Sequence, residues 1–193
     1  MIRLAMLRHG PTEWNAEGRM QGRADLPLSL AGQRQFASRR IPSGFASRQW
    51  FVSPLQRARD TAAALGIKAT TEIRLIEMDW GAYEGHTLAE LKVRDGDSFA
   101  QNENRGLDFQ PPGGESPRQV QLRLRPWLLE LARSGADAAA VSHKGVIRAL
   151  MAMAYDWPMT GKPPVKLDWS CLHEFRIPAS GIPEPLTMNI PLE

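Results

Sequence analysis

The chain has 193 residues, of which 42% are hydrophobic and 23% are charged, and its formal net charge is +3. This length and composition are typical of one globular domain with a sizeable core, and they exclude a disordered chain or a coiled coil. Lys and Arg are scattered instead of gathering in a run, so the charge pattern does not point to nucleic acid as a partner.

The single cysteine and the lack of long apolar segments bear on where the protein works. Cys171 has no second cysteine with which to form an intrachain disulfide, and this favours a reducing compartment. Residues 1–7 are apolar but run directly into Arg8 and His9 with no cleavage site, and no segment reaches the roughly 20 apolar residues of a membrane span. We therefore expect a cytoplasmic protein that contacts no membrane, with Cys171 as a buried structural thiol.

Short apolar runs predict the first strands. Residues 2–7 form a run that stops at Gly10, as expected for a strand buried on both faces at the centre of a sheet. Residues 50–52 form a second short strand, and residues 68–73 form a third.

Cap residues predict the helices that separate these strands. Residues 12–27 look irregular, and a helix follows over residues 29–40, starting from a serine cap. Ser53 followed by Pro54 pairs an N-cap with a proline at the first helical position, which predicts a helix from there towards Gly66.

The middle of the chain combines a capped helix with a polar segment. Thr87 and Glu90 make a capping box, which predicts a short helix. The segment 95–114 is polar and rich in Gly, Asn and Pro, and we interpret it as a surface excursion or lid on a single domain of residues 1–193.

A second capping box begins a long amphipathic helix. Ser116 caps it, Pro117 and Gln119 follow at the expected positions, and Gly135 ends it. Core packing explains its apolar stripe, which consists of Val120, Leu124, Trp127, Leu128 and Leu131.

The last third of the chain continues the alternation of strand and helix. Residues 138–141 are a buried strand that leads directly into a helix with Val146, Ile147, Leu150 and Met151 on its apolar side. Residues 171–177 and 186–190 read as edge strands. Strands alternating with capped helices predict an α/β fold, a three-layer α/β/α sandwich with a mostly parallel central sheet.

Chemically distinctive side chains follow the ends of three predicted strands. Arg8 and His9 follow the first strand, Ser53 and Arg57 the second, and His143 the strand before the last long helix. Because ligands of open α/β sheets bind beyond the carboxyl ends of the strands, we expect these groups to share one crevice. Helix N-termini that point into the same crevice would attract an anion.

Two arginines and two histidines around one pocket suit a tetrahedral phosphate, because guanidinium groups bind its oxygens and disperse its charge. A neutral imidazole can attack phosphorus as a nucleophile. The leaving alkoxide then needs a proton, and Glu77, expected to be enclosed by Trp80 and Tyr83, is the candidate donor. Taken singly, each of these residues also has an ordinary structural interpretation.

The motifs resemble, in order, those of the histidine phosphatase superfamily, which includes the cofactor-dependent phosphoglycerate mutases. The resemblance covers most of residues 2–150. Its blocks are Arg8-His9-Gly10 with Thr12 and Trp14-Asn15, Gly22 with Asp25, Pro27-Leu28-Ser29 and Gly32, Ser53-Pro54-Leu55-Gln56-Arg57-Ala58 with Thr61-Ala62, Glu77 with Trp80-Gly81 and Tyr83-Glu84-Gly85, Pro112-Gly113-Gly114-Glu115-Ser116, and Val141-Ser142-His143.

The resemblance implies a phosphoglycerate mutase-like fold and a role for each matching residue. His9 would be the phosphorylated nucleophile, and the phosphoryl oxygens would be bound by Arg8, Arg57, His143 and Asn15. Glu77 would protonate the leaving group and then activate water.

Further positions follow from the same resemblance. Thr12, Gln21 and Gly22 lie where family members approach the substrate. His86 and His173 match no functional position, so we expect them to be structural or surface residues. The resemblance implies a small-molecule phosphate ester as ligand, with no metal and no cofactor.

Two departures from the family pattern bear on the substrate. Lys144 stands where many relatives have glycine, and its ammonium either adds a phosphate contact or crowds the mouth of the pocket. The stretch from Glu77 to His143 is shorter than in the glycolytic mutases, and a more open site favours water as the acceptor.

The predicted function is a phosphomonoester hydrolase that acts through phosphohistidine on a small phosphorylated metabolite. A phosphoglycerate mutase-type phosphotransferase is an alternative, although it must exclude water until its intermediate reorients. A non-catalytic phospholigand-binding protein is another, although it would not need His9 or Glu77. A cysteine phosphatase is disfavoured because Arg176 follows Cys171 one residue too early. The natural substrate and the oligomeric state, a homodimer included, are left open.

Overall fold

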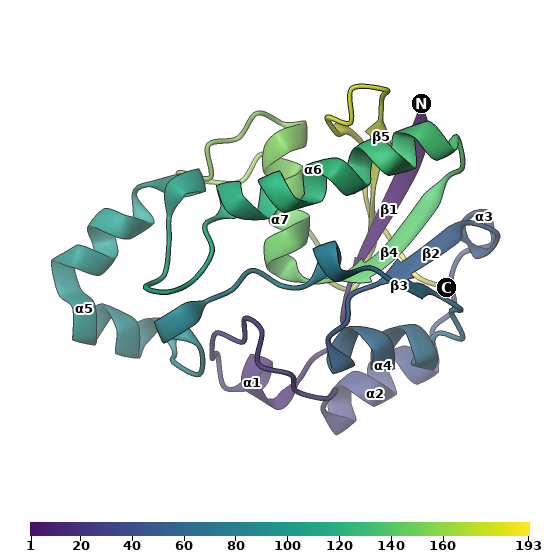
Figure 1. Ribbon diagram of the computed structural model, residues 1–193. Coiled ribbons are helices and arrows are strands. Elements are labelled where there is room, and N and C mark those ends of the chain that lie inside the picture. The colour runs from purple at the N-terminus through teal and green to yellow at the C-terminus, as the bar shows by residue number, and fades with distance from the viewer.

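The computed structural model describes residues 1–193, and its strands form one six-stranded sheet (Figure 1). The strand order is β3-β2-β4-β1-β5-β6. The pairs β2–β3, β2–β4 and β1–β4 are parallel, whereas β1–β5 and β5–β6 are antiparallel. The strands are β1 (Ile2–Arg8), β2 (Gln49–Val52), β3 (Thr70–Thr71), β4 (Ala138–Ser142), β5 (Leu172–Ile177) and β6 (Glu184–Ile190).

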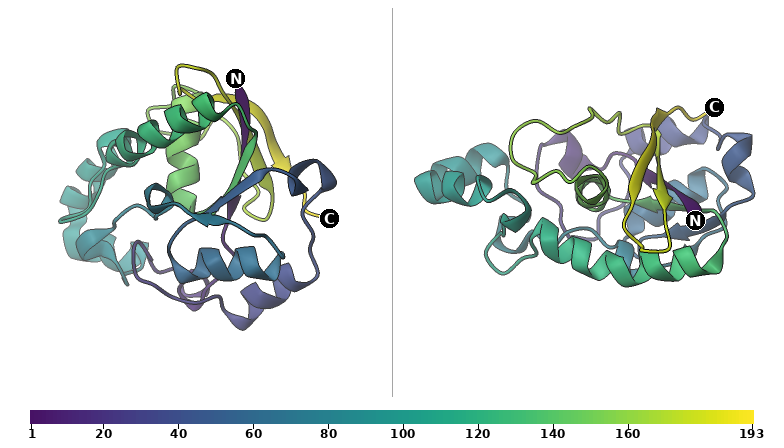
Figure 2. Two further views of the ribbon diagram at one scale, coloured as in Figure 1. Left: turned by 45° about the vertical axis from the view of Figure 1, so that its right-hand side comes forward. Right: turned by 90° about the horizontal axis from the view of Figure 1, so that it is seen from above.

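Helices cover both faces of this sheet. α6 and α7 pack on one face and α2 and α4 on the other, as Figures 1 and 2 show. The α-helices are α1 (Glu13–Ala16), α2 (Leu30–Ala37), α3 (Ser43–Ala46), α4 (Gln56–Ala64), α5 (Leu88–Glu103), α6 (Pro117–Ser134) and α7 (Lys144–Ala154). Three short 3-10 helices are η1 (Ile73–Leu75), η2 (Gly81–Tyr83) and η3 (Gly106–Asp108). The predicted three-layer α/β/α sandwich is confirmed.

β1 lies inside the sheet and contributes to both cores. Leu4 and Met6 belong to the cluster under α6 and α7, while Ala5 and Leu7 belong to the cluster under α2 and α4. Alternate side chains of a strand point to opposite faces, so a continuous apolar run is what a strand covered on both sides requires. The predicted burial on both faces is thereby confirmed for Ile2 and for residues 4–7, whereas Arg3 is exposed.

The capped helix α6 follows its sequence signals closely. Ser116 and Gln119 form the predicted capping box, and Gly135 ends the helix with φ +73. The predicted apolar stripe is buried, and Trp127 stacks edge-on against Phe51 of β2 at 5.6 Å between ring centroids. α7 likewise buries the four apolar residues predicted for it.

The predicted start of α4 is wrong by two residues. Its N-cap is Leu55, not Ser53, and the helix begins at Gln56. The reason is that the Ser53 N–H still donates to the Val141 carbonyl at 3.0 Å, so Ser53 continues the ladder of β2. Its hydroxyl is used inside the site described below.

Short elements account for most of the other differences. The stretch 12–27, predicted as irregular, contains α1, which buries none of its residues and so carries no apolar stripe. The helix predicted over 29–40 ends at Ala37, with α3 as a separate turn. The strand predicted over 68–73 shrinks to the two exposed residues of β3, because only β2 pairs with it.

The prediction of β5 as an edge strand is wrong, because β5 lies between β1 and β6. Two of its polar side chains are buried and have partners elsewhere in the chain. Glu174 is buried through an ion pair with Arg48, and His173 is buried while accepting from the Asn189 N–H. β6 is the edge strand. The prediction of a buried Cys171 thiol is confirmed.

The segment predicted as a polar excursion is helical in its first part. α5 continues to Glu103, with a kink at Gly96, where φ is +50 and ψ is −125. It projects away from the sheet (Figures 1 and 2) and carries Phe99, which packs with Tyr83 and Leu91. That the segment acts as a lid stays a prediction.

None of the helices has both the length and the apolar character that a bilayer span requires.

We predict that Leu128→Ala lowers the free energy of unfolding by about 2–5 kcal/mol, because it removes a fully buried side chain from the core between α6 and the sheet. Denaturant unfolding followed by circular dichroism measures the change. Leu122→Ala is the matched control on the same helix, since Leu122 is 62% exposed, and it should change stability by no more than about 0.5 kcal/mol. Equal losses in the two variants would contradict the assigned faces of α6.

Candidate active site

Three strands of the sheet end side by side and bring two histidines together. The His9 N–H donates to the Ser142 carbonyl at 2.9 Å, so the β1–β4 pairing extends one residue beyond β1. His143 follows Ser142 directly, and the ring centroids of His9 and His143 are 5.0 Å apart. The expectation that these two residues share one crevice is met.

The hydrogen bonds of His9 determine which of its nitrogens is free. Nδ1 lies 2.6 Å from the Gly10 carbonyl oxygen, which can only accept, so Nδ1 carries the proton. Arg57 donates its Nε–H towards Nε2 at 3.3 Å, which places the lone pair there. Burial, together with the charges of Arg57 and Arg8, lowers the pKa of His9 well below its ordinary value, so the ring is neutral near pH 7.

Arg57 is fully buried, and each of its two terminal nitrogens donates to a main-chain carbonyl. Nη1 donates to the Ala24 carbonyl and Nη2 to the Gly22 carbonyl, both at 2.7 Å. Burial lowers the pKa of Arg57 from its ordinary value, although a guanidinium remains charged at any physiological pH. The arginine is therefore a fixed cation with its Nε–H directed at His9.

The loop that supplies these carbonyls is itself braced. Gly22 has φ +52, and a Cβ there would lie 1.9 Å from Oε1 of Glu84, so only glycine fits. The Arg23 side chain pairs with Asp79 at 3.3 Å and with Glu115 at 3.2 Å. The position of Arg57 thus depends on contacts with the segment after β3 and with the start of α6.

His143 is held by a hydroxyl. Its Nε2 lies 2.6 Å from Ser53 Oγ, which also accepts from the Leu55 N–H at 3.3 Å. When the Ser53 hydroxyl donates to Nε2, the remaining proton of the neutral ring sits on Nδ1, which is buried and has no partner in the protein. Burial, followed by the nearness of the His9 ring and the charge of Arg57, lowers the pKa of His143 well below its ordinary value.

Glu77 lies at the N-terminus of α7. Its Oε1 accepts from the Met78 N–H at 2.7 Å and its Oε2 from the Gly145 N–H at 3.1 Å. A carboxyl group is favourable at this end of a helix because unpaired N–H groups and the helix dipole meet there. A Cβ at position 145 would lie 2.4 Å from Oε1, so the approach needs glycine.

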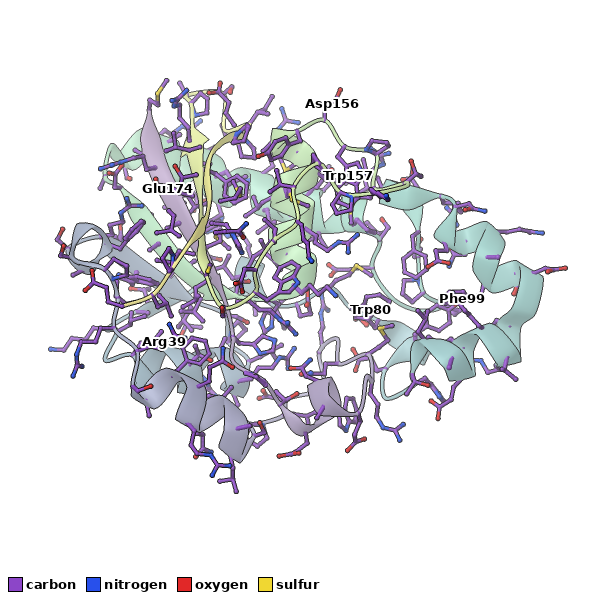
Figure 3. The ribbon with its side chains drawn as sticks, turned by 180° about the vertical axis from the view of Figure 1, so that it is seen from behind. Arg39, Trp80, Phe99, Asp156, Trp157 and Glu174 are labelled. Atoms are coloured by element: carbon purple, nitrogen blue, oxygen red, sulfur yellow. The ribbon has the colours of Figure 1, made fainter.

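The aromatic residues near Glu77 in sequence have other neighbours. Trp80 packs against Phe109 at 5.7 Å, and Tyr83 packs against Phe99 at 5.6 Å between ring centroids. Figure 3 shows Phe99 on α5 and Trp80 between α5 and the sheet. Main-chain donors, instead of the expected aromatic enclosure, hold the Glu77 carboxyl group.

Arg8 and Lys144 approach the same indole ring. The guanidinium carbon of Arg8 and the Nζ of Lys144 each lie 5.7 Å from the ring centroid of Trp169. Nε of Arg8 is buried with no hydrogen-bond partner, and burial lowers the pKa of Arg8. Lys144, which the sequence left as either a phosphate contact or an obstruction, is exposed and lies against Trp169.

A pocket of about 530 Å³ opens beside Arg8 and His9. Asn15 lines it, and because its Oδ1 accepts from the N–H and hydroxyl of Thr12, its amide nitrogen is left as a donor. Gln21 is buried with Oε1 unpaired. The other lining residues are Pro11, Gln35, Lys166, Leu167, Asp168, Trp169 and Ser170.

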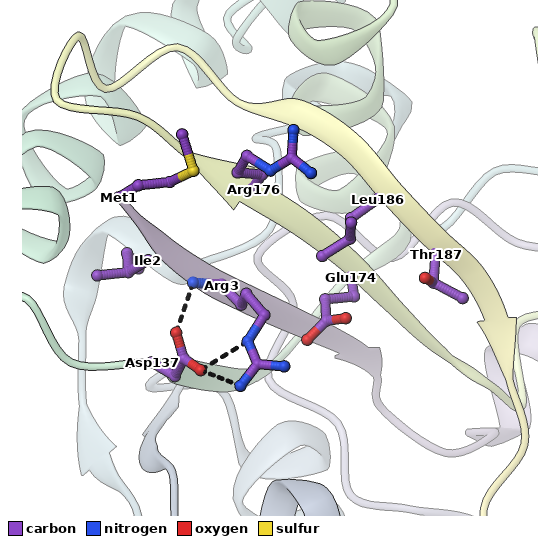
Figure 4. Close-up of a pocket in the computed structure, with 8 residues that line it drawn as sticks. All are labelled: Met1, Ile2, Arg3, Asp137, Glu174, Arg176, Leu186 and Thr187. Carbon is purple, nitrogen blue, oxygen red and sulfur yellow. Dashed lines mark hydrogen bonds and ion pairs between the residues drawn. The ribbon is translucent and has the colours of Figure 1, made fainter.

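A second pocket, of about 470 Å³, lies at the opposite end of β1 (Figure 4). Its two most prominent charges neutralise each other, because Arg3 donates to Asp137 through both its main chain and its side chain at 2.7 Å. It contains no histidine. The pocket beside His9 is therefore the candidate site, because it lies next to the histidine pair.

The two remaining histidines lie outside this cluster. His86 is partly exposed and lies 3.8 Å from Glu90. His173 is fully buried on β5, and burial lowers its pKa to about 4. No three His, Cys, Asp or Glu side chains gather where they could hold a metal ion.

Three residues of the cluster received no role of their own from the sequence. Ser53 was expected in the crevice but was interpreted as a helix cap, and Gly145 was not singled out. Thr61 accepts from the Gly10 N–H at 2.9 Å and donates to the Arg57 carbonyl at 2.7 Å, and thereby joins the loop after β1 to α4. Thr61 lies one helical turn after Arg57, and this spacing was the signal in the sequence that could have indicated its role.

Comparisons with known proteins agree with this geometry. A model of the histidine phosphatase superfamily (branch 1) matches residues 4–190. Glucosyl-3-phosphoglycerate phosphatase of Mycobacterium tuberculosis is 36% identical over 177 residues, covering 83% of this chain and 78% of that protein. Bifunctional protein Rv2228c of the same species is 35% identical over 165 residues, covering 80% of this chain and 44% of that protein. The chain thus spans less than half the length of this second relative.

Solved structures resemble the whole chain. The structure of mycobacterial glucosyl-3-phosphoglycerate phosphatase Rv2419c with VO3 has a TM-score of 0.78 and 28% sequence identity, and covers 98% of this chain and 100% of that one. TTHB049 from Thermus thermophilus has a TM-score of 0.74 and 28% identity, and covers 98% of this chain and 99% of that one.

We predict that the free energy of unfolding falls as the pH is lowered from 6.5 to 5. The buried histidines His9, His143 and His173 have lowered pKa values, so in this range the unfolded chain binds more protons than the folded one. Each contributes a slope of up to about 1.4 kcal/mol per pH unit, which urea unfolding at several pH values would measure. His173→Asn should reduce the slope, whereas His86→Asn should not. A flat profile would show that these rings are protonated in the fold.

Proposed function

The chain belongs to the histidine phosphatase superfamily, and we propose on this premise that it hydrolyses phosphate monoesters through a phosphohistidine on Nε2 of His9. The observation that carries the proposal is the hydrogen bonding of His9. Its Nδ1–H is used by the Gly10 carbonyl, so the Nε2 lone pair faces the site beside a buried guanidinium. A neutral ring with a fixed tautomer is the form of histidine that can act as a nucleophile.

Four groups are placed to bind the phosphoryl oxygens in this proposal. Arg8 and Arg57 supply positive charge, His143 supplies its Nδ1–H, and Asn15 supplies its amide nitrogen. Support comes from unused donors: Nε of Arg8 and Nδ1 of His143 are buried without partners. Donors that are already oriented stabilise the charge that develops on the equatorial oxygens during transfer.

In the first step, Nε2 of His9 attacks phosphorus and the bond to the ester oxygen breaks. The carboxyl group of Glu77 gives its proton to that oxygen, so the alcohol leaves neutral and the carboxylate remains. The Met78 and Gly145 N–H groups then stabilise the carboxylate.

In the second step, Glu77 takes a proton from a water molecule while the water oxygen attacks phosphorus. The bond between phosphorus and Nε2 breaks, and its electron pair returns to the ring of His9. Inorganic phosphate leaves, and Glu77 is again protonated for the next cycle. The same residue acts as acid and then as base, as microscopic reversibility requires.

We propose hydrolysis of a small phosphorylated metabolite over the mutase alternative because the relatives that match most of their own length carry phosphatase names. Thr12, Gln21 and Gly22 are proposed to line the approach to the site. We place the reaction in the cytoplasm, and the support for that is a single cysteine, buried and free.

His9→Ala should lower kcat/KM for p-nitrophenyl phosphate by roughly 10⁴-fold or more, because the nucleophile is lost. A phosphoenzyme, trapped by alkaline denaturation of wild type mixed with labelled substrate, should be absent from the variant. His86→Ala, at a partly exposed histidine, is the control and should retain both signals. Since His9 is buried, thermal unfolding must first show that the variant is folded. Labelled protein in a folded His9→Ala variant would refute the assignment of the nucleophile.

Glu77→Gln should slow alkyl phosphates about 10²-fold more than p-nitrophenyl phosphate, because the activated aryl group leaves without a proton. The kcat/KM values for the two esters measure this difference, because they report the phosphorylation of His9 and not the hydrolysis step that both esters share. Glu13→Gln makes the same change at an exposed position of α1 and should leave the ratio of the two rates as in wild type. An equal loss on both esters would remove the role of Glu77 as acid.

A further inference from the structure

Two cations at the edge of the site have no acidic partner. Arg8 and Lys144 form no ion pair within 4.0 Å, although both lie against the indole of Trp169. The other arginine of the site, Arg57, differs from them because main-chain carbonyls receive its donors. Positive charge on the Trp169 side of the pocket is therefore not neutralised by the protein.

The position of Lys144 is unfavourable for the helix to which it belongs. It is the first residue of α7, where the positive end of the helix dipole disfavours a cation. Partial desolvation, together with the charges of Arg8 and Arg148, lowers the pKa of Lys144, and Glu77 is the acidic group that opposes this change. Glu77 already accepts two main-chain N–H groups and does not pair with the lysine. A placement that costs stability is typical of residues retained for binding.

The segment that carries Trp169 is fastened to the edge strand β6. Asn189 accepts from the Asp168 N–H at 2.7 Å and donates to the Lys166 carbonyl at 3.0 Å. The main-chain N–H of Asn189 donates to His173, whose ring packs edge-on against Trp169 at 6.1 Å between centroids. The indole ring of Trp169 is thus held in a fixed position. A cation that lies over its face is attracted to the ring and is held in place with it.

The one carboxylate in this wall of the pocket is already engaged. Oδ1 of Asp168 accepts from the N–H of Ser170 at 2.9 Å and from its hydroxyl at 2.7 Å. Lys166 lines the same wall and forms no ion pair. Three cations, Arg8, Lys144 and Lys166, therefore stand against this one carboxylate, and the net charge around Trp169 is positive.

We propose that Lys144, held against Trp169, binds a second anionic group on the alcohol part of the substrate, so that the preferred esters carry a carboxylate or a second phosphate besides the phosphoryl group that is transferred. This inference rests on the proposed function. It assigns the pocket of about 530 Å³ to the leaving alcohol, while Arg57 and His143 bind the transferred group. Lys144 stands beside this pocket, 5.7 Å from the ring of Trp169, which lines it. Trp169 is a positioning residue for the ammonium.

Matched substrate pairs test this assignment. In the first pair, 3-phosphoglycerate has a carboxylate where glycerol 3-phosphate has a hydroxymethyl group. In the second pair, fructose 1,6-bisphosphate has a second phosphate that fructose 6-phosphate lacks. For wild type we expect a higher kcat/KM for the anionic member of at least one pair, and the pair that shows it distinguishes carboxylate from phosphate as the bound group.

Lys144→Gln should reduce that selectivity, the ratio of the two kcat/KM values, by about tenfold through KM, because a charge-assisted hydrogen bond is lost. Lys144→Arg keeps the charge and should keep the ratio within about threefold of wild type. Trp169→Leu should reduce it in part. Lys68→Gln removes an exposed lysine far along the chain from the pocket residues and should leave the ratio unchanged, which controls for general steering by net charge.

The outcomes separate this inference from the function on which it rests. A wild-type protein that hydrolyses none of the four esters, nor p-nitrophenyl phosphate, would overturn the proposed function. A wild-type protein that hydrolyses both members of each pair equally well would overturn only the second anion site. If Lys144→Gln lowers kcat/KM equally for both members of a pair, the second anion site is also overturned, because the lysine would then act on the transferred phosphate.

Discussion

The Nε–H of Arg57 points at Nε2 of His9 across 3.3 Å, and this contact sets the constraints that the rest of the site obeys. The two terminal nitrogens of this fully buried guanidinium donate to the carbonyls of Gly22 and Ala24, which bind it without neutralising its charge. The charge therefore remains available at the site. It also keeps the neighbouring ring unprotonated, so the same group that attracts an anion preserves the nucleophile that attacks it.

The surrounding structure holds that arrangement still. The Gly10 carbonyl fixes the tautomer of His9, Ser53 fixes the ring of His143, and Thr61 joins the loop after β1 to the helix that carries Arg57. Each partner is a main-chain group or a short hydroxyl side chain. Such partners have few rotamers to lose, so positioning costs little conformational entropy. The carboxyl group of Glu77 is held in the same way, by two main-chain N–H groups.

The residues of the cluster could be predicted from the sequence because strand ends and helix starts are marked by strong local signals. The apolar run before Arg8 and the capping box of α6 are examples, and both appear in the structure as expected. Contacts that depend on tertiary approach could not be predicted in this way. Ser53 resembled a cap because its partner, His143, lies 90 positions away, and the inner place of β5 depends on its pairing with β1 at the other end of the chain. The nearness of Trp169 to Lys144 had no local signal at all.

Different parts of the fold form the phosphate-binding groups and the wall around Trp169. Every group that would touch the transferred phosphate comes from β1, from the residue after β1 or β4, or from the helices α1 and α4, whereas the wall around Trp169 is fastened by Asn189 on the edge strand β6. Edge strands tolerate sequence change better than central ones, since they have only one neighbour to satisfy. Substitutions in the β5–β6 hairpin would thus change which alcohols are accepted, and the residues that bind the phosphate would stay the same.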